Sequence, residues 1–230
     1  AEYGRRVLIV DFDPQGAASV GLGINALDME QTIYTLLMNP KADVRATVCR
    51  TATDNLDIIP ANIDLSAAEV QLVNEVARES ALARVLRHVE ADYDVILIDC
   101  QPSLGLLAVN ALTAAHGVIV PVEAEFFALR GVALLVETIE TVRDRINPRL
   151  KIDGIVATMV DSRTLHSREV LQRLQEAFGD LVFDTRIGRT IKFPDASVAT
   201  EPILSYAPNH AGAHAYRRLA REVIARGDAA

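Results

Sequence analysis

Short runs of uninterrupted apolar residues alternate along this chain with longer segments in which apolar residues recur every three or four positions. Such runs are typical of buried strands, and the three-to-four spacing is typical of amphipathic helices. The runs predict strands at residues 7–10, 56–60, 93–99, 117–122, 152–160 and 182–185. The spacing predicts helices at residues 32–38, 82–89, 104–115, 129–146, 167–178 and 211–226. A further helix is expected from Ser66, with Glu69 in the capping-box position.

This alternation of strands and helices predicts the α/β class, with a mainly parallel, doubly wound sheet and helices on both faces. A chain of 230 residues without a linker or an internal repeat indicates a single domain over residues 1–230. The chain begins at Ala1, directly before its first predicted strand, and we expect this beginning to be a truncation.

Acidic residues stand where two of the predicted strands end. Asp11 and Asp13 follow the apolar run at 7–10, and Asp99 closes the strand at 93–99. The carboxyl ends of parallel strands meet at the edge of a sheet where ligands bind, so these carboxylates should line one crevice and require a cation. Asp99 would then hold Mg²⁺ beside nucleotide phosphates, and Asp13 would orient water. The alternative is that Asp99 is an ordinary residue between a strand and a turn.

A glycine-rich phosphate loop is absent from the 230 residues. No GxxxxGK[ST] segment occurs, and the lysines, Lys41, Lys151 and Lys192, follow no glycine-rich turn. We therefore expect that this chain does not bind ATP by itself with useful affinity.

Composition and charge narrow the function classes. Cys49 and Cys100 have no metal-ligand spacing, and no apolar run approaches the ~20 residues that span a bilayer, so we expect a cytoplasmic protein without a structural metal. The net charge of −8 disfavours nucleic acid binding, but it is unevenly distributed. Residues 143–230 hold 14 basic and 11 acidic side chains, against 9 and 20 in residues 1–142, which permits a basic face in the C-terminal part.

Four motifs, in this order, resemble the ParA/Soj partition ATPases of chromosomes and plasmids, MinD-related P-loop proteins with a deviant Walker A motif. They are RVLIVDFDPQG at 6–16, LDIIPANIDLS at 56–66, YDVILIDCQPSLG at 93–105 and PVEAEFFAL at 121–129. The resemblance extends from near Ala1 to about Ile224. It implies that the family's first strand, phosphate loop and most of its first helix are missing before residues 1–4.

The resemblance also implies roles for individual residues. Asp13 would position the hydrolytic water, Asp99 would be the Walker B acid on magnesium, and Asp11 would be an acid near the magnesium in the nucleotide site. The other implied nucleotide-binding residues are Pro14, Gln15 and Pro102. For the intact protein, the implied function is ATP hydrolysis coupled to homodimerisation and to non-specific DNA binding.

The implied partners are DNA and a ParB-like centromere-binding protein, in a nucleoid-associated cytoplasmic location. Residues 186–192 resemble a DNA-contacting segment of the family, so Arg189 and Lys192 are the DNA-binding candidates. Gly188 replaces a frequent proline, and residues 207–212 lack the family's arginines, so a simple solvated surface remains the alternative.

Two other functions stay open. One is a ParA-like binding scaffold without ATPase activity, and the other is a MinD-like regulator at a membrane surface. The second would use the basic amphipathic helix at 211–226, although we favour a helix docked on the sheet. Loss of a central strand would leave two unpaired strand edges, so we expect the 230-residue chain to be unstable or to aggregate.

Overall fold

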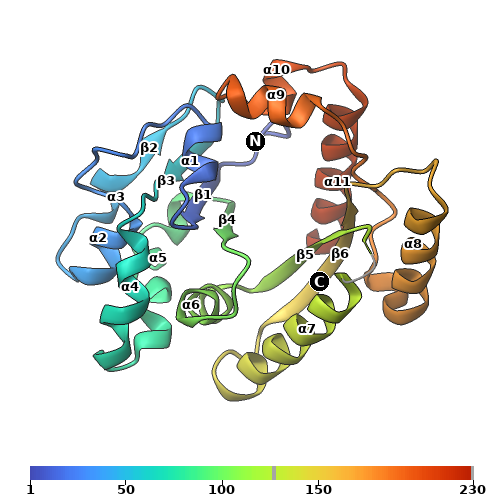
Figure 1. Cartoon of the computed structure of the whole chain (residues 1–230). Helices are drawn as coiled ribbons and strands as arrows, with labels where there is room; N and C mark the ends of the chain where they lie inside the picture. Colours follow the sequence, from blue (N-terminus) through green and yellow to red (C-terminus); the bar gives the residue numbers. More distant parts are fainter. Residues whose placement is uncertain (126–127, 229–230) are drawn as a thin grey trace. The chain divides into compact units, whose positions relative to one another are not determined.

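The computed structural model describes residues 1–125 and 128–228 (Figure 1). The chain forms two compact units, Ala1–Ala115 and His116–Ala230. Parallel strands with packed helices make up each unit, which confirms the α/β class and the mainly parallel pairing. The assignment of residues 1–230 to a single domain stays a prediction.

The first unit contains a four-stranded sheet in the order β2-β3-β1-β4. Its strands are β1 (Val7–Phe12), β2 (Cys49–Arg50), β3 (Leu56–Ile59) and β4 (Val95–Cys100). β1 pairs in parallel with β3 and with β4, whereas the short β2 is antiparallel to β3. The strands predicted at 7–10, 56–60 and 93–99 are therefore confirmed.

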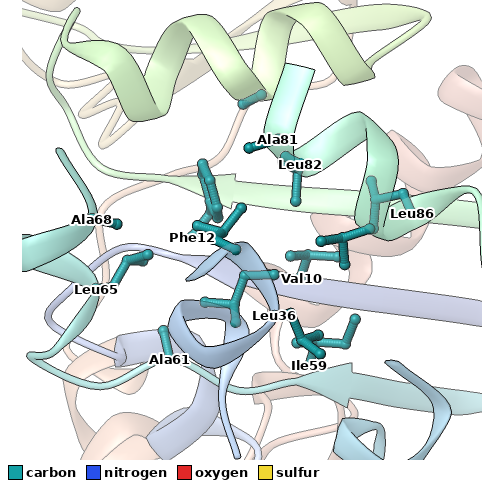
Figure 2. Close-up of a cluster of buried hydrophobic side chains, with 14 of the residues drawn as sticks. Val10, Phe12, Leu36, Ile59, Ala61, Leu65, Ala68, Ala81, Leu82 and Leu86 are labelled. Atoms are coloured by element: carbon teal, nitrogen blue, oxygen red, sulfur yellow. The ribbon is translucent and has the colours of Figure 1, made fainter. Parts of the chain in front are cut away.

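Helices cover one face of this sheet. They are α2 (Ile33–Met38), α4 (Leu65–Gln71), α5 (Ala81–Leu86) and α6 (Leu106–Ala114), with α1 (Ala17–Gly21), α3 (Val44–Thr47) and the 3₁₀ turns η1 (Leu72–Asn74), η2 (Arg78–Ser80) and η3 (Glu90–Asp92) between them. Val10 and Phe12 of β1 point into this core, where they meet Leu65 and Leu82 (Figure 2). Burial of each large apolar side chain contributes about 1.5–3 kcal/mol, so the core fixes β1 and thereby the residues at its end.

α4 begins earlier than the sequence suggested. Asn62 Oδ1 accepts a hydrogen bond from Asp64 N at 3.2 Å, and the Ser66 hydroxyl donates to the Ile63 carbonyl at 2.8 Å. The chain thus already turns at Asn62, and the predicted cap at Ser66 is wrong. Glu69, expected in that capping box, lies against the start of α6 instead, where its Oε1 accepts from Leu107 N at 3.5 Å.

β4 is the last strand of its sheet and is poorly covered. Val95 and Leu97, on the same side of the strand as Asp99, are 37% and 45% exposed. In most parallel sheets, helices cover both faces and bury such apolar side chains. In the second unit, β5 is likewise at one end of its sheet. β4 and β5 are thus end strands within the described residues, and the loss of a central strand between them stays a prediction.

The second unit has helices on both faces of a parallel pair, β5 (Gly117–Glu123) and β6 (Lys151–Thr158). On one face, Ile155 and Ala157 of β6 pack with α7 (Ala128–Arg145) and α8 (Leu165–Phe178). On the other face, Val156 packs with Phe183 and with α11 (Ala211–Asp228). The predicted strands at 117–122 and 152–160 and the helices at 129–146, 167–178 and 211–226 are confirmed.

The apolar side of α11 is used inside this unit. Ala215, Leu219 and Val223 belong to the cluster around Phe183, as expected for a helix docked on a sheet. No helix in the described ranges is long and apolar enough to cross a membrane.

The predicted strand at 182–185 is wrong. This segment, which follows η4 (Gly179–Leu181), forms only an isolated bridge between Val182 and Ile155 of β6. Its backbone amides at Asp184 and Thr185 donate instead to the carboxylate of Glu222 in α11, both at 3.0 Å. The Glu222 side chain thus accepts the hydrogen bonds that the carbonyls of a neighbouring strand would accept in a sheet. Two short helices that we did not predict, α9 (Lys192–Val198) and α10 (Ile203–Tyr206), follow it.

Candidate functional site

The three predicted acids gather at the carboxyl edge of the first unit's sheet. Asp11 and Asp99 are paired neighbours in the register of β1 and β4, and Asp13 follows β1 directly. This edge is the place where parallel α/β sheets bind ligands.

Asp13 sits in a tight turn that uses its own oxygens. Its Oδ1 accepts from Gln15 N at 2.9 Å, and its carbonyl accepts from Gly16 N, also at 2.9 Å. Pro14 is half-buried and Gln15 is exposed within this turn. Gly16, with φ of 63°, then leads into α1. The turn therefore fixes the Asp13 backbone while its side chain stays partly accessible.

Asp11 has the opposite environment, since it is 0% exposed. Its Oδ2 accepts from both the backbone N and the hydroxyl of Ser19, at 2.8 and 2.7 Å, and its Oδ1 accepts from Asp13 N at 3.3 Å. Burial raises the pKa of the Asp11 carboxyl, and the hydrogen bonds from Ser19 and Asp13 act against this shift. Protein donors thus occupy both of its oxygens.

Asp99 lies at the exposed end of β4 and is affected by the other two acids. Desolvation raises its pKa, and the charges of Asp11 and Asp13 raise it further. Desolvation and the charge of Asp99 also raise the pKa of the adjacent Cys100 thiol to about 12. A cation placed here would relieve this repulsion between carboxylates. No group of three or more His, Cys, Asp or Glu side chains within residues 1–125 and 128–228 has the arrangement of a metal site.

Pro102, the remaining nucleotide-site candidate, lies in the exposed loop between β4 and α6. The loop turns there, since Ser103 N donates to the Gln101 carbonyl at 2.8 Å and the Ser103 hydroxyl accepts from Gly105 N at 3.2 Å. It thus starts at the strand end that carries Asp99. In the fourth motif, at 121–129, Phe126 and Phe127 lie outside the described residues.

The two DNA-binding candidates lie in the second unit and already have acidic neighbours. Arg189 is 3.5 Å from Glu125 Oε1, and Lys192 is 3.0 Å from Asp195 Oδ2 and 5.8 Å from the centre of the Tyr206 ring. Their side chains remain 62% and 40% exposed. Exposed ion pairs of this kind contribute only about 0–1 kcal/mol, so they leave both cations available to a stronger anionic partner.

Sequence reasoning did not assign a role to Ser19, which the structure places at the centre of the site. Ser19 is completely buried, donates to Asp11, and accepts from Ala61 N at 3.2 Å. The available signal was a small polar residue three positions after Gly16, where a helix starts and its backbone amides need acceptors.

The fold is of the α/β class with three acids at one sheet edge, and comparison with known proteins identifies the family. Residues 1–152 match a family model described as an AAA domain. The chain is 44% identical over 227 residues to the sporulation initiation inhibitor protein Soj of Bacillus subtilis, covering 99% of this chain and 89% of that protein. The chain belongs to the ParA/Soj family of chromosome-partitioning ATPases.

Two mycobacterial proteins are also similar. The chain is 58% identical over 225 residues to an uncharacterized protein of Mycobacterium tuberculosis, covering 98% of this chain and 71% of that protein. A crystal structure described as cobyrinic acid a,c-diamide synthase from Mycobacterium smegmatis, with bound ADP and magnesium, has a TM-score of 0.76 and 42% identity. That match covers 86% of this chain and 80% of the other.

Proposed function

We propose that this chain carries the metal- and water-handling half of the site of a ParA-type ATPase. The main supporting observation is that Asp13 and Asp99 lie at one sheet edge, where desolvation and then the charges of Asp11 and Asp13 raise the pKa of Asp99. Mg²⁺, which prefers carboxylate oxygen and usually takes only one or two protein carboxylates, is the cation that suits this edge, with Asp99 as the residue that would hold it. A cation held by Asp99 would supply positive charge beside the phosphates, and Asp13 would accept a hydrogen bond from water and orient it. The similar M. smegmatis structure with ADP and magnesium supports this assignment.

The nucleotide would lie along the Asp13 turn and the β4–α6 loop, with Pro14, Gln15 and Pro102 against it. These 230 residues contain no GxxxxGK[ST] segment, so the proposal requires a phosphate loop from outside them to complete the site. The free edge of β4 and its exposed Val95 and Leu97 support this proposal, since a strand and a helix are needed to cover them.

The test compares the product of the complete gene with residues 1–230 alone. We expect the complete product to hydrolyse ATP with magnesium, and Asp13→Ala to abolish hydrolysis while nucleotide binding persists. We expect residues 1–230 alone to show no saturable ATP binding in a calorimetric titration. Tight magnesium-dependent binding by residues 1–230, or unchanged hydrolysis by Asp13→Ala, would contradict the assignment. A lysine-containing glycine-rich segment in frame before Ala1 is the matching genetic observation.

ATP-dependent homodimerisation, non-specific DNA binding and response to a ParB-like protein complete the proposed cycle, which would place the protein on the nucleoid in the cytoplasm. Arg189 and Lys192 are the proposed DNA contacts, in the part of the chain with excess basic residues. Arg189→Ala should weaken binding to DNA of any sequence and reduce the salt dependence by about one counterion. Lys41→Ala, an exposed lysine of the first unit, is the control and should change neither. Equal loss in both variants would remove Arg189 from the interface.

A further inference from the structure

Asp11 differs from its two neighbours because its carboxylate is directed into the protein. It is 0% exposed and its Oδ2 is held by two donors of Ser19, a residue that is also fully buried. Ser19 is the third residue of α1, so its backbone N–H has no carbonyl partner one helical turn earlier. Asp11 therefore caps α1 from the end of β1.

The contact continues from Ser19 to the segment after β3. The Ser19 hydroxyl, while donating to Asp11, accepts from the backbone N–H of Ala61 at 3.2 Å. The carbonyl of the same Ala61 lies against Gly16, where an added Cβ would come within 2.7 Å of it. Both ends of the segment from Gly16 to Ser19 are thus fixed on Ala61.

Asp11 also contacts Asp13 directly. Its Oδ1 accepts from Asp13 N at 3.3 Å, and Asp13 then closes its own turn with Gln15 and Gly16. One buried carboxylate therefore connects the strand end, the turn that carries Asp13, and the helix that follows.

We propose that Asp11 is a positioning residue, which through Ser19 and the amide of Asp13 holds the Asp13 turn in its working geometry rather than ligating the metal. This rests on the proposed role of Asp13. A carboxylate whose oxygens accept three protein hydrogen bonds in the interior is costly to redirect, because each buried donor it releases loses its partner. The metal-binding function then falls to Asp99, at the exposed end of β4.

The conservative substitution at Asp11 separates the two roles. A carboxamide oxygen still accepts from both Ser19 donors, its NH2 group gives up only the long 3.3 Å hydrogen bond from Asp13 N, and it carries no charge for a cation. In the product of the complete gene, Asp11→Asn should keep kcat for ATP hydrolysis within about tenfold of wild type. Asp11→Ala should lose about 100-fold, the cost of misplacing a catalytic group by about 1 Å. Ser19→Ala should lose about tenfold. All three should need the same magnesium concentration for half-maximal rate, whereas Asp99→Asn should need at least about tenfold more.

The proposal is overturned if Asp11→Asn raises the magnesium requirement as Asp99→Asn does, or if Asp11→Asn is as damaged as Asp11→Ala. If the circular dichroism spectrum shows that Asp11→Ala does not fold, the rates and magnesium requirements of Asp11→Asn and Ser19→Ala test the proposal instead. Hydrogen exchange of the Asp13, Ser19 and Ala61 amides, measured on the same protein without nucleotide, supplies a second test. In Ser19→Ala, the Ala61 amide loses its acceptor and should exchange faster than in wild type. An unchanged exchange rate at Ala61 would overturn the proposal. This measurement needs no hydrolysis. If the wild type had no ATPase activity, the proposed function would be refuted, but the hydrogen-bonded link from Asp11 through Ser19 to Ala61 could still be tested.

Discussion

At the scale of single residues, the end of the sheet opposite the acids is held by an ion pair. Arg6, just before β1, donates to both oxygens of Asp94, just before β4, through Nη2 at 2.9 Å and its backbone N at 2.8 Å. These hydrogen bonds lower the pKa of Asp94 to about 2. The pair joins the starts of the two strands whose ends carry Asp11 and Asp99.

This pair predicts a pH dependence of stability. Because the folded pKa of Asp94 is about 2, below its ordinary value of 3.8, the stabilisation is complete above pH ~4 and is lost as the pH falls through 2. We expect the free energy of unfolding of Asp94→Asn to fall less steeply than that of wild type between pH 4 and 2, as measured by urea unfolding. Asp54→Asn changes an exposed carboxylate with no ion pair among the described residues, and its slope should match wild type. Parallel curves for Asp94→Asn and wild type would contradict the prediction.

A second residue-scale prediction concerns Gly16. Its φ of 63° is unfavourable for other residues, and an added Cβ would meet a backbone oxygen, that of Ala61, at 2.7 Å. Gly16→Ala should therefore destabilise the protein by more than the ~1–3 kcal/mol of left-handed strain alone. Gly4→Ala, at φ of 78° with no atom within 4 Å, is the matched control for that strain. Urea midpoints that do not separate the two variants would show that the close approach to Ala61 contributes nothing.

At the scale of elements, α11 is fastened by a few polar side chains in addition to its apolar side. Arg226 donates to the carbonyls of Asp153 and Val182, at 2.9 and 3.2 Å, and its guanidinium lies 4.1 Å from the centre of the Phe183 ring. Glu222, one helical turn earlier, accepts from the amides of Asp184 and Thr185. These contacts replace the strand that we predicted at 182–185.

We predict that Arg226→Lys destabilises the protein by about 1–3 kcal/mol. A lysine has a single nitrogen and cannot reach the carbonyls that Nη1 and Nη2 of Arg226 contact separately, and it cannot stack flat on Phe183. Arg221→Lys, an exposed arginine of the same helix, should change stability by less than about 0.5 kcal/mol. Thermal unfolding gives the stability, and faster hydrogen exchange in α11 should accompany the loss. Equal stability of the two variants would mean that the apolar contacts alone hold α11.

The accuracy of the sequence prediction depended on the element. Continuous apolar runs such as 93–99 and long amphipathic helices such as 129–146 carry a strong period, and both were correct. The short α9 and α10 span only one or two turns, too few to show a period. At the site, the two apolar runs correctly predicted that Asp11 and Asp99 end neighbouring parallel strands and lie at one edge of the sheet. They did not predict that Asp11 turns inward, because this depends on Ser19 and on Ala61, which is 42 residues further along the chain.

At the scale of the whole molecule, the uncovered side of β4 predicts opposite effects of one substitution in two forms of the protein. Leu97 is 45% exposed, next to a free strand edge. In residues 1–230 alone, Leu97→Asp should reduce aggregation, because a charge at an exposed apolar edge opposes association. In the product of the complete gene, the same change should cost at least about 2 kcal/mol, because the proposed additional strand and helix would bury the charge.

The control is Val76→Asp, since Val76 is 90% exposed after η1 and away from the edge. It should change stability by less than about 0.5 kcal/mol in both forms. Light scattering on heating measures aggregation, and urea unfolding measures stability. If Leu97→Asp is harmless in the complete product, the face of β4 stays open there, and the phosphate loop must reach the carboxylates by another route. The proposal requires that Leu97→Asp, and not Val76→Asp, reduces aggregation of residues 1–230 and lowers the stability of the complete product.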